Sequence, residues 1–131
     1  MTENDQIVYR QLSYEIVGCA QRVHTTLGPG FPESVYQRAL CRELLNQKIP
    51  FASEAPFEVY YEDAIAGKFR VDIFVDDRIV LELKAVSDIC DDHISQAYAY
   101  LKASGAKLAM LIDFGKRRLQ TKRIVMSKRK I

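Results

Sequence analysis

The side chains best suited to chemistry are three charged residues on two neighbouring stretches of the chain. Residues 69–75 alternate apolar and polar side chains, which predicts a strand with Asp72 on its polar face. A second alternating stretch, residues 79–85, places Glu82 and Lys84 together on one face. Two carboxylates and a lysine on one face of a sheet could hold a divalent cation and act on a phosphate group.

The apolar pattern also selects how these two strands pair. A three-residue turn at residues 76–78 places Asp72 opposite Glu82 and Arg70 opposite Lys84, whereas a two-residue turn would mix the faces. Opposed residues have Cβ atoms about 5 Å apart, so the two carboxylates would repel without a cation between them. We therefore expect a Mg²⁺ or Mn²⁺ site here, with the lysine positioning or deprotonating a water or neutralising a phosphate oxygen.

An alternative interpretation of the same residues is a solvated hairpin face. Asp72, Glu82, Lys84 and Arg70 would then pair as surface ions, each contributing little to stability. Against this interpretation, helices must cover the sheet, and a carboxylate cluster beneath a helix calls for a partner.

The remaining pattern predicts the elements that position these strands. Apolar stripes and helix-ending glycines indicate three helices, and alternating or continuous apolar runs indicate four or five strands. The helix before the fourth strand would make the third and fourth strands parallel, which gives an α/β fold with a mixed sheet flanked by helices. The expected helices span 7–27, 32–47 and 91–104, the expected strands 57–61, 69–75, 79–85, 107–113 and 123–126, and a turn is expected at 62–67.

Length and composition predict one domain spanning residues 1–131. Apolar residues make up 48% of the chain and charged residues 27%, which is typical of a globular protein. An acidic N-terminus and the lack of a long apolar run predict a cytoplasmic protein that does not insert into a membrane. The three cysteines, Cys19, Cys41 and Cys90, are expected to be buried thiols, because their spacing suggests neither disulfides nor a zinc site.

The charge of the chain is unevenly distributed. Residues 116–131 hold eight basic residues and no acid, while the rest of the chain holds 11 basic and 17 acidic residues. Such a basic segment could offset the repulsion between an acidic site and a nucleic acid, or could be a solvated terminus.

Several tyrosines and both histidines could be mistaken for functional residues. The tyrosines could stack on unpaired bases or could fill core and rim positions. The histidines are expected to be cap or surface residues, because neither has a second nitrogen ligand nearby. These residues are Tyr60, Tyr61, Tyr98, Tyr100, His24 and His93.

Four separated motifs together resemble a known family. Residues 30–36, Gly-Phe-Pro-Glu-Ser-Val-Tyr, resemble the signature of the GxxExxY protein family, a branch of the PD-(D/E)XK nuclease superfamily. Residues 71–73 and 81–85 resemble its metal-binding core, and residues 96–100 resemble the Q-x-x-x-Y element of lambda-exonuclease-like members. The resemblance extends from about residue 8 to about residue 126. Val71 stands where the superfamily's name has proline.

The resemblance implies a restriction-endonuclease-like core and a role for six residues. Asp72 and Glu82 would be metal ligands, Glu33 would supplement the metal site, and Lys84 would be the catalytic lysine. Gln96 and Tyr100, four residues apart on one helix, would brace the metal site or contact substrate phosphate.

These observations favour a divalent-metal-dependent nuclease that hydrolyses phosphodiester bonds. The expected partner is nucleic acid, DNA rather than RNA, and a homodimer is left open. A rival interpretation is a weakly active or inactive binding module on the same fold. A third is a structural role in an oligomer that uses an edge strand at residues 121–126.

Overall fold

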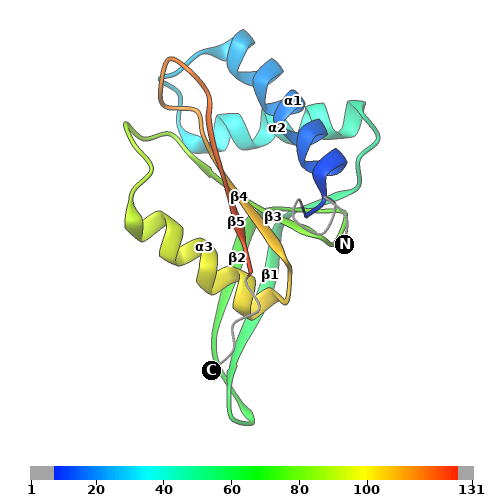
Figure 1. Ribbon diagram of the computed structural model, residues 1–131, viewed down its shortest axis with the longest axis vertical. Coiled ribbons are helices and arrows are strands. Elements are labelled where there is room, and N and C mark those ends of the chain that lie inside the picture. Colours follow the sequence, from blue (N-terminus) through cyan, green and yellow to red (C-terminus); the bar gives the residue numbers. More distant parts are fainter. Residues whose placement is uncertain (1–7, 127–131) are drawn as a thin grey trace.

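The computed structural model describes residues 8–126 and contains three helices and five strands in that range (Figure 1). The order of elements is the one predicted, including the fifth strand. The bounds are α1 Arg10–Leu27, α2 Glu33–Asn46, β1 Phe51–Tyr61, β2 Ala64–Val75, β3 Ile79–Lys84, α3 Asp91–Ser104, β4 Leu108–Asp113 and β5 Gln120–Val125.

The five strands form one mixed sheet in the order β1-β2-β3-β4-β5. β3 and β4 are parallel, and the other neighbouring pairs are antiparallel. The parallel pair is joined by α3, which ends at Gly105 in a left-handed conformation that glycine adopts without strain. The predicted crossover and the predicted mixed sheet are both confirmed.

The predicted turn between β2 and β3 is confirmed as well. Val75 pairs with Ile79, which leaves the three residues 76–78 in the turn, and Ile73 pairs with Leu81. The ladder of this pair ends there. The ladder does not extend to Arg70 and Lys84, so the prediction of an Arg70–Lys84 pair is wrong.

β1 is longer than the sequence predicted. It begins at Phe51, before the predicted start at residue 57, and continues through Pro56. β1 has a partner on one side only, so a residue without an N–H can face away from the ladder. The following turn is also shorter than predicted, since Tyr61 pairs with Ala64 and two residues remain between them.

Helices cover the sheet on both faces (Figure 1). Helices α1 and α2 pack together over one face, where Ile73, Leu81 and Met110 join their apolar residues in one core cluster. Helix α3 covers the other face, where Val80 and Leu111 pack with its buried residues. Even-numbered residues of β3 therefore face α3, and odd-numbered residues face α1 and α2.

The β1–β2 hairpin separates from the rest of the sheet below the last β2–β3 pair. Its distal half projects from the body of the molecule (Figure 1). Opposite Asp72, Glu54 of β1 has a φ of 55°, a left-handed conformation that interrupts the regular pleat of the strand. The hairpin thus diverges from β3 at the residues predicted to carry chemistry.

The cysteines only partly match expectation. Cys19 is buried and Cys41 is half-buried, but Cys90 is exposed just before α3, so the prediction of a buried thiol is wrong there. All three are free thiols. Among the helices of residues 8–126, none is long and apolar enough to cross a membrane.

Candidate active site

Asp72 and Glu82 face each other where β2 separates from β3. The Asp72 N–H donates to Glu82 Oε2 at 3.1 Å, and the Leu83 N–H donates to Asp72 Oδ2 at 2.7 Å. The two carboxyl groups therefore continue the connection between the strands after the backbone ladder has ended. The predicted juxtaposition of Asp72 and Glu82 is present, held by side-chain hydrogen bonds instead of a regular ladder.

Burial and mutual repulsion disfavour the charged forms of this pair. Burial, followed by the charge of Asp72, raises the pKa of Glu82 to about 8, and only 5% of Glu82 is exposed. Burial also raises the pKa of Asp72, with smaller contributions from the carboxylates of Glu33 and Glu54. Lys84 opposes both shifts without cancelling them.

Lys84 is the last residue of β3 and lies on the same face of that strand as Glu82. It is half-buried, and its positive charge lowers the pKa of both carboxyl groups. In the parallel register it pairs with Asp113 at the end of β4. The predicted group of two carboxylates and one lysine is thus assembled at the point where the sheet opens.

Glu33 is the first residue of α2 and reaches this site from the opposite layer. It is exposed, and its charge raises the pKa of both Asp72 and Glu82. The loop before it is fixed by Tyr36, whose hydroxyl donates to the Gly28 carbonyl at 2.6 Å and accepts from the Phe31 N–H at 3.1 Å.

Tyr36 also anchors α2 to the strand ends. Its ring is fully buried and stacks on Phe114, with ring centroids 4.6 Å apart. The tyrosine of the GxxExxY-like motif is therefore a structural anchor that positions Glu33, one turn of helix earlier.

The two predicted residues of α3 differ in how closely they approach the site. Tyr100 is half-buried and stacks on Phe69 of β2, with ring centroids 4.3 Å apart. Burial raises its pKa, and the charges of Glu82 and Asp72 add to this effect. Gln96 is exposed, and within the described residues it makes no hydrogen bond to the other five predicted site residues.

The donor set fits a hard divalent cation. Asp72 and Glu82 supply carboxylate oxygens, and their raised pKa values mean that a cation between them would relieve repulsion. No group of three or more His, Cys, Asp or Glu side chains between residues 8 and 126 is arranged to hold a metal ion. Glu33 therefore supplements the pair electrostatically and is not gathered with it into a three-carboxylate cluster.

Sequence reasoning missed Gln37, which ties α2 to both strands of the hairpin. Its Nε2 donates to the Asp72 carbonyl at 3.1 Å, to Glu54 Oε2 at 2.8 Å and to Ser53 Oγ at 3.2 Å. Gln37 lies one helical turn after Glu33 and so on the same face of α2. That spacing was the only sequence signal available for it.

A second missed residue, Asp113, holds the loop that follows Lys84. Its Oδ1 accepts the N–H groups of Val86 at 3.0 Å and Gly115 at 2.9 Å, and the side chain is fully buried. Its Oδ2 has no hydrogen-bond partner among the described residues. The two loops approach so closely that a Cβ on Gly115 would lie 2.5 Å from Val86 backbone atoms.

The basic segment 116–131 divides into residues with different environments. Lys116 forms a salt bridge with Asp88 at 2.9 Å, and Arg123 donates to Ser13 Oγ and to the Val8 carbonyl. Arg117 and Arg118 are exposed and line a cavity of about 580 Å³ beside Gly28 and Pro29. The remaining basic residues of this segment, at 128–130, lie outside the described residues.

The two histidines are used structurally in this region. His93 Nδ1 accepts the Cys90 N–H at 3.0 Å at the start of α3, which confirms the predicted capping role. His24 is 7% exposed and its Nε2–H donates to the Lys116 carbonyl at 2.8 Å, so it is not the surface residue that was one of the two expectations.

Comparisons with known proteins agree with this geometry. A family model for the PD-(D/E)XK nuclease superfamily matches residues 10–124. The crystal structure of SSO0001 is similar, with a TM-score of 0.57 and 18% identity over 94% of this chain. An alkaline exonuclease from Laribacter hongkongensis has a TM-score of 0.54 and 15% identity over 97% of this chain.

These similarities differ in how much of each relative they span. The chain covers 59% of SSO0001 and 73% of the exonuclease. A search of curated proteins found no match. At these identities the structural likeness shows the fold, while the family model covers nearly the whole described chain. The chain therefore belongs to the PD-(D/E)XK nuclease superfamily.

Proposed function

We propose that this chain is a divalent-metal-dependent nuclease of the GxxExxY branch, acting on DNA in preference to RNA. The observation that carries the proposal is the pair of half-buried Asp72 and buried Glu82 beside Lys84, at the point where β2 and β3 separate. Such a pair destabilises the fold unless it binds a proton or a cation. In a nuclease site, this need for a cation would favour binding of the catalytic metal ion.

Asp72 and Glu82 would hold Mg²⁺ or Mn²⁺, with Glu33 adding negative charge at the rim of the site. When bound, the cation would acidify a water and polarise the phosphate. Lys84 would position or deprotonate that water, or would neutralise a phosphate oxygen.

Three further residues support this group. Tyr100 would limit the access of water to Glu82 through its stack on Phe69. Gln96, exposed one helical turn earlier, would contact substrate phosphate. Gln37 would keep Asp72 in place by binding its carbonyl.

The test is cleavage of labelled single- and double-stranded DNA and RNA in Mg²⁺ or Mn²⁺. We expect the wild type to cleave in the presence of the metal and not in chelator. Asp72→Asn and Lys84→Ala should each abolish this metal-dependent cleavage. Matched controls are Asp77→Asn and Lys107→Ala, at exposed positions at the other end of the β3–β4 pair, and both should retain activity. Asn also suits the positive φ of Asp77. Cleavage that survives both site substitutions would contradict the proposal.

A second candidate function is a binding module with little turnover. The absence of a three-carboxylate group among residues 8–126 favours it, because two carboxylates alone hold a cation more weakly. Salt-sensitive binding of nucleic acid without cleavage of any substrate, unaffected by Asp72→Asn, would favour this function over the nuclease.

A further inference from the structure

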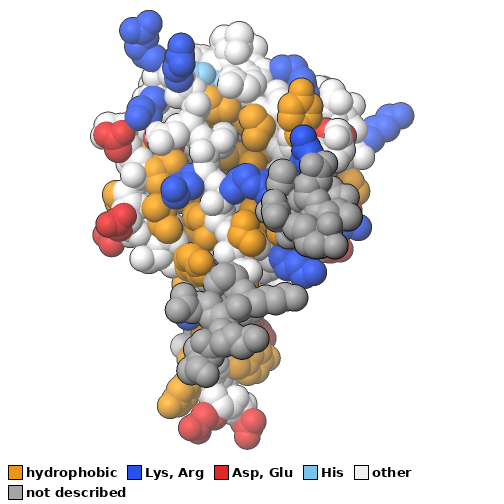
Figure 2. Space-filling view, viewed as in Figure 1, with side chains coloured by type: hydrophobic (Ala, Val, Ile, Leu, Met, Phe, Trp, Pro, Cys, Tyr) orange, Lys and Arg blue, Asp and Glu red, His pale blue; other side chains and the backbone are white. Residues whose placement is uncertain are grey.

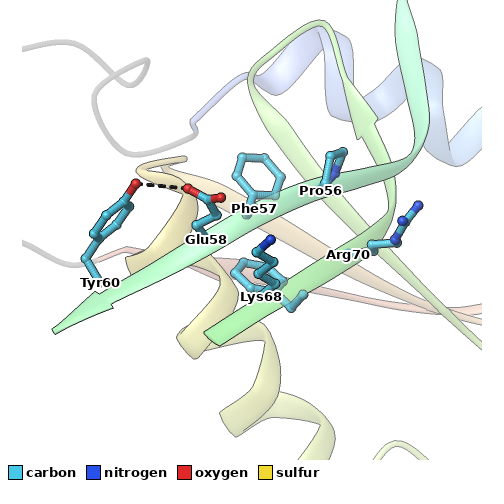
Figure 3. Close-up of a pocket in the computed structure, with 7 residues that line it drawn as sticks. Pro56, Phe57, Glu58, Tyr60, Lys68 and Arg70 are labelled. Atoms are coloured by element: carbon cyan, nitrogen blue, oxygen red, sulfur yellow. Dashed lines mark hydrogen bonds between the residues drawn. The ribbon is translucent and has the colours of Figure 1, made fainter. Parts of the chain in front are cut away.

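The projecting half of the β1–β2 hairpin carries an open cavity of about 820 Å³, larger than the cavity beside Arg117 and Arg118 (Figure 3). It is lined by residues of the hairpin alone. Two are basic, one is acidic and the others are aromatic or proline. Besides two phenylalanines, the lining residues are Pro56, Glu58, Tyr60, Lys68 and Arg70.

Strand pairing places these five residues on one face of the hairpin. Arg70 pairs with Pro56 and Lys68 pairs with Glu58, and side chains two residues apart on a strand share a face. The intervening residues Phe57 and Phe69 face the other way, where they pack in the cluster beneath α3. The face with the basic residues is therefore the outer face of the hairpin, defined here by these five residues.

The positive charges of this outer face are not neutralised within the protein. Lys68 and Arg70 are exposed, and neither forms an ion pair with another described residue. Glu58, directly opposite Lys68, instead accepts the Tyr60 hydroxyl at 2.9 Å (Figure 3). Two unpaired cations on a shallow concave surface are suited to a polyanion.

These cations lie on the strand that also carries Asp72. Lys68, Arg70 and Asp72 occur at two-residue intervals of β2, which correspond to steps of about 6.6 Å. The alternation changes at Asp72, because Val71 packs in the cluster under α3 and Ile73 packs in the cluster under α1 and α2. Lys68 and Arg70 are thus near Asp72 along the strand but are not on the face of the sheet that carries Glu82 and Lys84.

The exposed tyrosine indicates which form of nucleic acid fits. Tyr60 is 59% exposed, and its hydroxyl is held by Glu58, so an aromatic ring is presented to solvent beside the two cations. Stacking on such a ring requires an unpaired base, because duplex bases are already stacked on each other.

The tip of the hairpin limits the path of such a strand. Acidic side chains gather at the tip (Figure 2), where Glu62 and Asp63 form the turn, and they would repel a phosphate backbone. The strand would therefore lie on the outer face between Arg70 and Tyr60 and would not extend past the tip.

We propose that the outer face of the β1–β2 hairpin binds a single strand of the substrate, with phosphates on Lys68 and Arg70 and a base stacked on Tyr60. This inference rests on the proposed function for the class of the substrate. Binding to the face itself does not require cleavage, so the two can fail separately.

The experiment measures binding of fluorescent single- and double-stranded oligonucleotides by anisotropy in chelator, where cleavage is stopped. The double variant Lys68→Ala/Arg70→Ala should raise the Kd for the single strand by about tenfold or more, and should reduce the slope of log K against log salt by about 1.4. Tyr60→Ala should weaken single-strand binding by about fivefold or more, while Tyr60→Phe keeps most of it.

The control is Arg42→Ala/Lys107→Ala, which removes the same charge from exposed positions on α2 and just before β4. It should leave the Kd within about twofold of wild type. Equal losses in the two double variants would overturn the proposal, because they would indicate a general charge effect.

Three other outcomes are decisive. Tighter binding of duplex, with no effect of Tyr60→Ala, would overturn the inference while leaving the nuclease proposal intact. Loss of single-strand binding in the hairpin variant, together with absent cleavage by wild type, would support the inference and contradict the nuclease. A dimer that dissociates on Tyr61→Ser/Ile65→Ser, with unchanged nucleic-acid binding by Lys68→Ala/Arg70→Ala, would make this hairpin a self-association surface and overturn the inference.

Discussion

Replacing Glu82 by glutamine should stabilise the metal-free protein at alkaline pH. The glutamine side chain can still accept the Asp72 N–H through its amide oxygen, so the substitution removes charge with little change in shape. The pKa of Glu82 is raised from 4.5 to about 8, so between these values the folded state binds a proton that the unfolded state has released. The contribution of the protonated Glu82 to the free energy of unfolding is therefore fully present below pH 4.5 and is lost as the pH rises to 8.

The size of this effect follows from the same shift. A difference of about 3.5 pKa units corresponds to at most about 5 kcal/mol at pH 8 and above, a large part of the stability of a domain this size. The raised pKa of Asp72 also makes the free energy of unfolding of the wild type fall with rising pH, and part of that pKa shift remains in the variant. We expect the variant to be more stable than wild type by about 2–5 kcal/mol at pH 8 and by little at pH 4.5.

The assay is urea unfolding in chelator at pH values from 4.5 to 9, with Glu62→Gln at the exposed hairpin tip as the control. Mn²⁺ should stabilise wild type at pH 8 and should have little effect on Glu82→Gln. A wild-type stability that is flat or rises between pH 5 and 8, with a variant less stable at pH 8, would refute the reasoning.

Substitutions at three further positions, Gln37, Asp113 and Gly115, test the contacts that support the site. Gln37→Ala removes the hydrogen bonds to Asp72 and Glu54 and should lower the free energy of unfolding by about 1–2 kcal/mol. Gln37→Glu should lower the free energy of unfolding more at pH 8 than at pH 5. The reverse order in urea unfolding would contradict the role given to Gln37. Asp113→Ala leaves the Val86 and Gly115 N–H groups without their acceptor and should cost about 2–4 kcal/mol, so a change below about 0.5 kcal/mol would argue against the anchor. Gly115→Ala should lower the midpoint of thermal unfolding, because its Cβ would lie 2.5 Å from the Val86 backbone. The control Gly18→Ala, in α1, should be neutral or stabilising, because the nearest atom to its Cβ is Arg22 Nη1 at 3.9 Å. Equal midpoints in the two variants would contradict the close contact.

The apolar alternation made the register of β2 and β3 predictable. A one-residue slip would have moved every apolar side chain of β3 to the wrong face, so the pattern admitted one turn length. That register brought Asp72 opposite Glu82. It could not indicate that the backbone ladder ends at Ile73, because the separation depends on the irregular Glu54 and on carboxylates taking the place of ladder hydrogen bonds.

The supporting residues were hidden for different physical reasons. Gln37 and Asp72 are 35 residues apart, and the sequence pattern around a glutamine on the polar side of a helix does not predict a long-range contact. Asp113 ends a continuous apolar run and could have been a surface residue as easily as a buried acceptor. The predicted strand began only at residue 57, after Pro56. Proline is tolerated within β1 because β1 lies at the edge of the sheet, and that position depends on the topology.

The most direct test of the central claim is calorimetric titration of Mn²⁺ into the protein at pH 8. We expect binding by wild type that is lost or greatly weakened in Asp72→Asn, with proton release from the Glu82 carboxyl on binding. Asp77→Asn should bind as wild type does. Binding of equal affinity in wild type and Asp72→Asn, or no binding by a folded wild type, would contradict the claim that the Asp72–Glu82 pair is a metal centre.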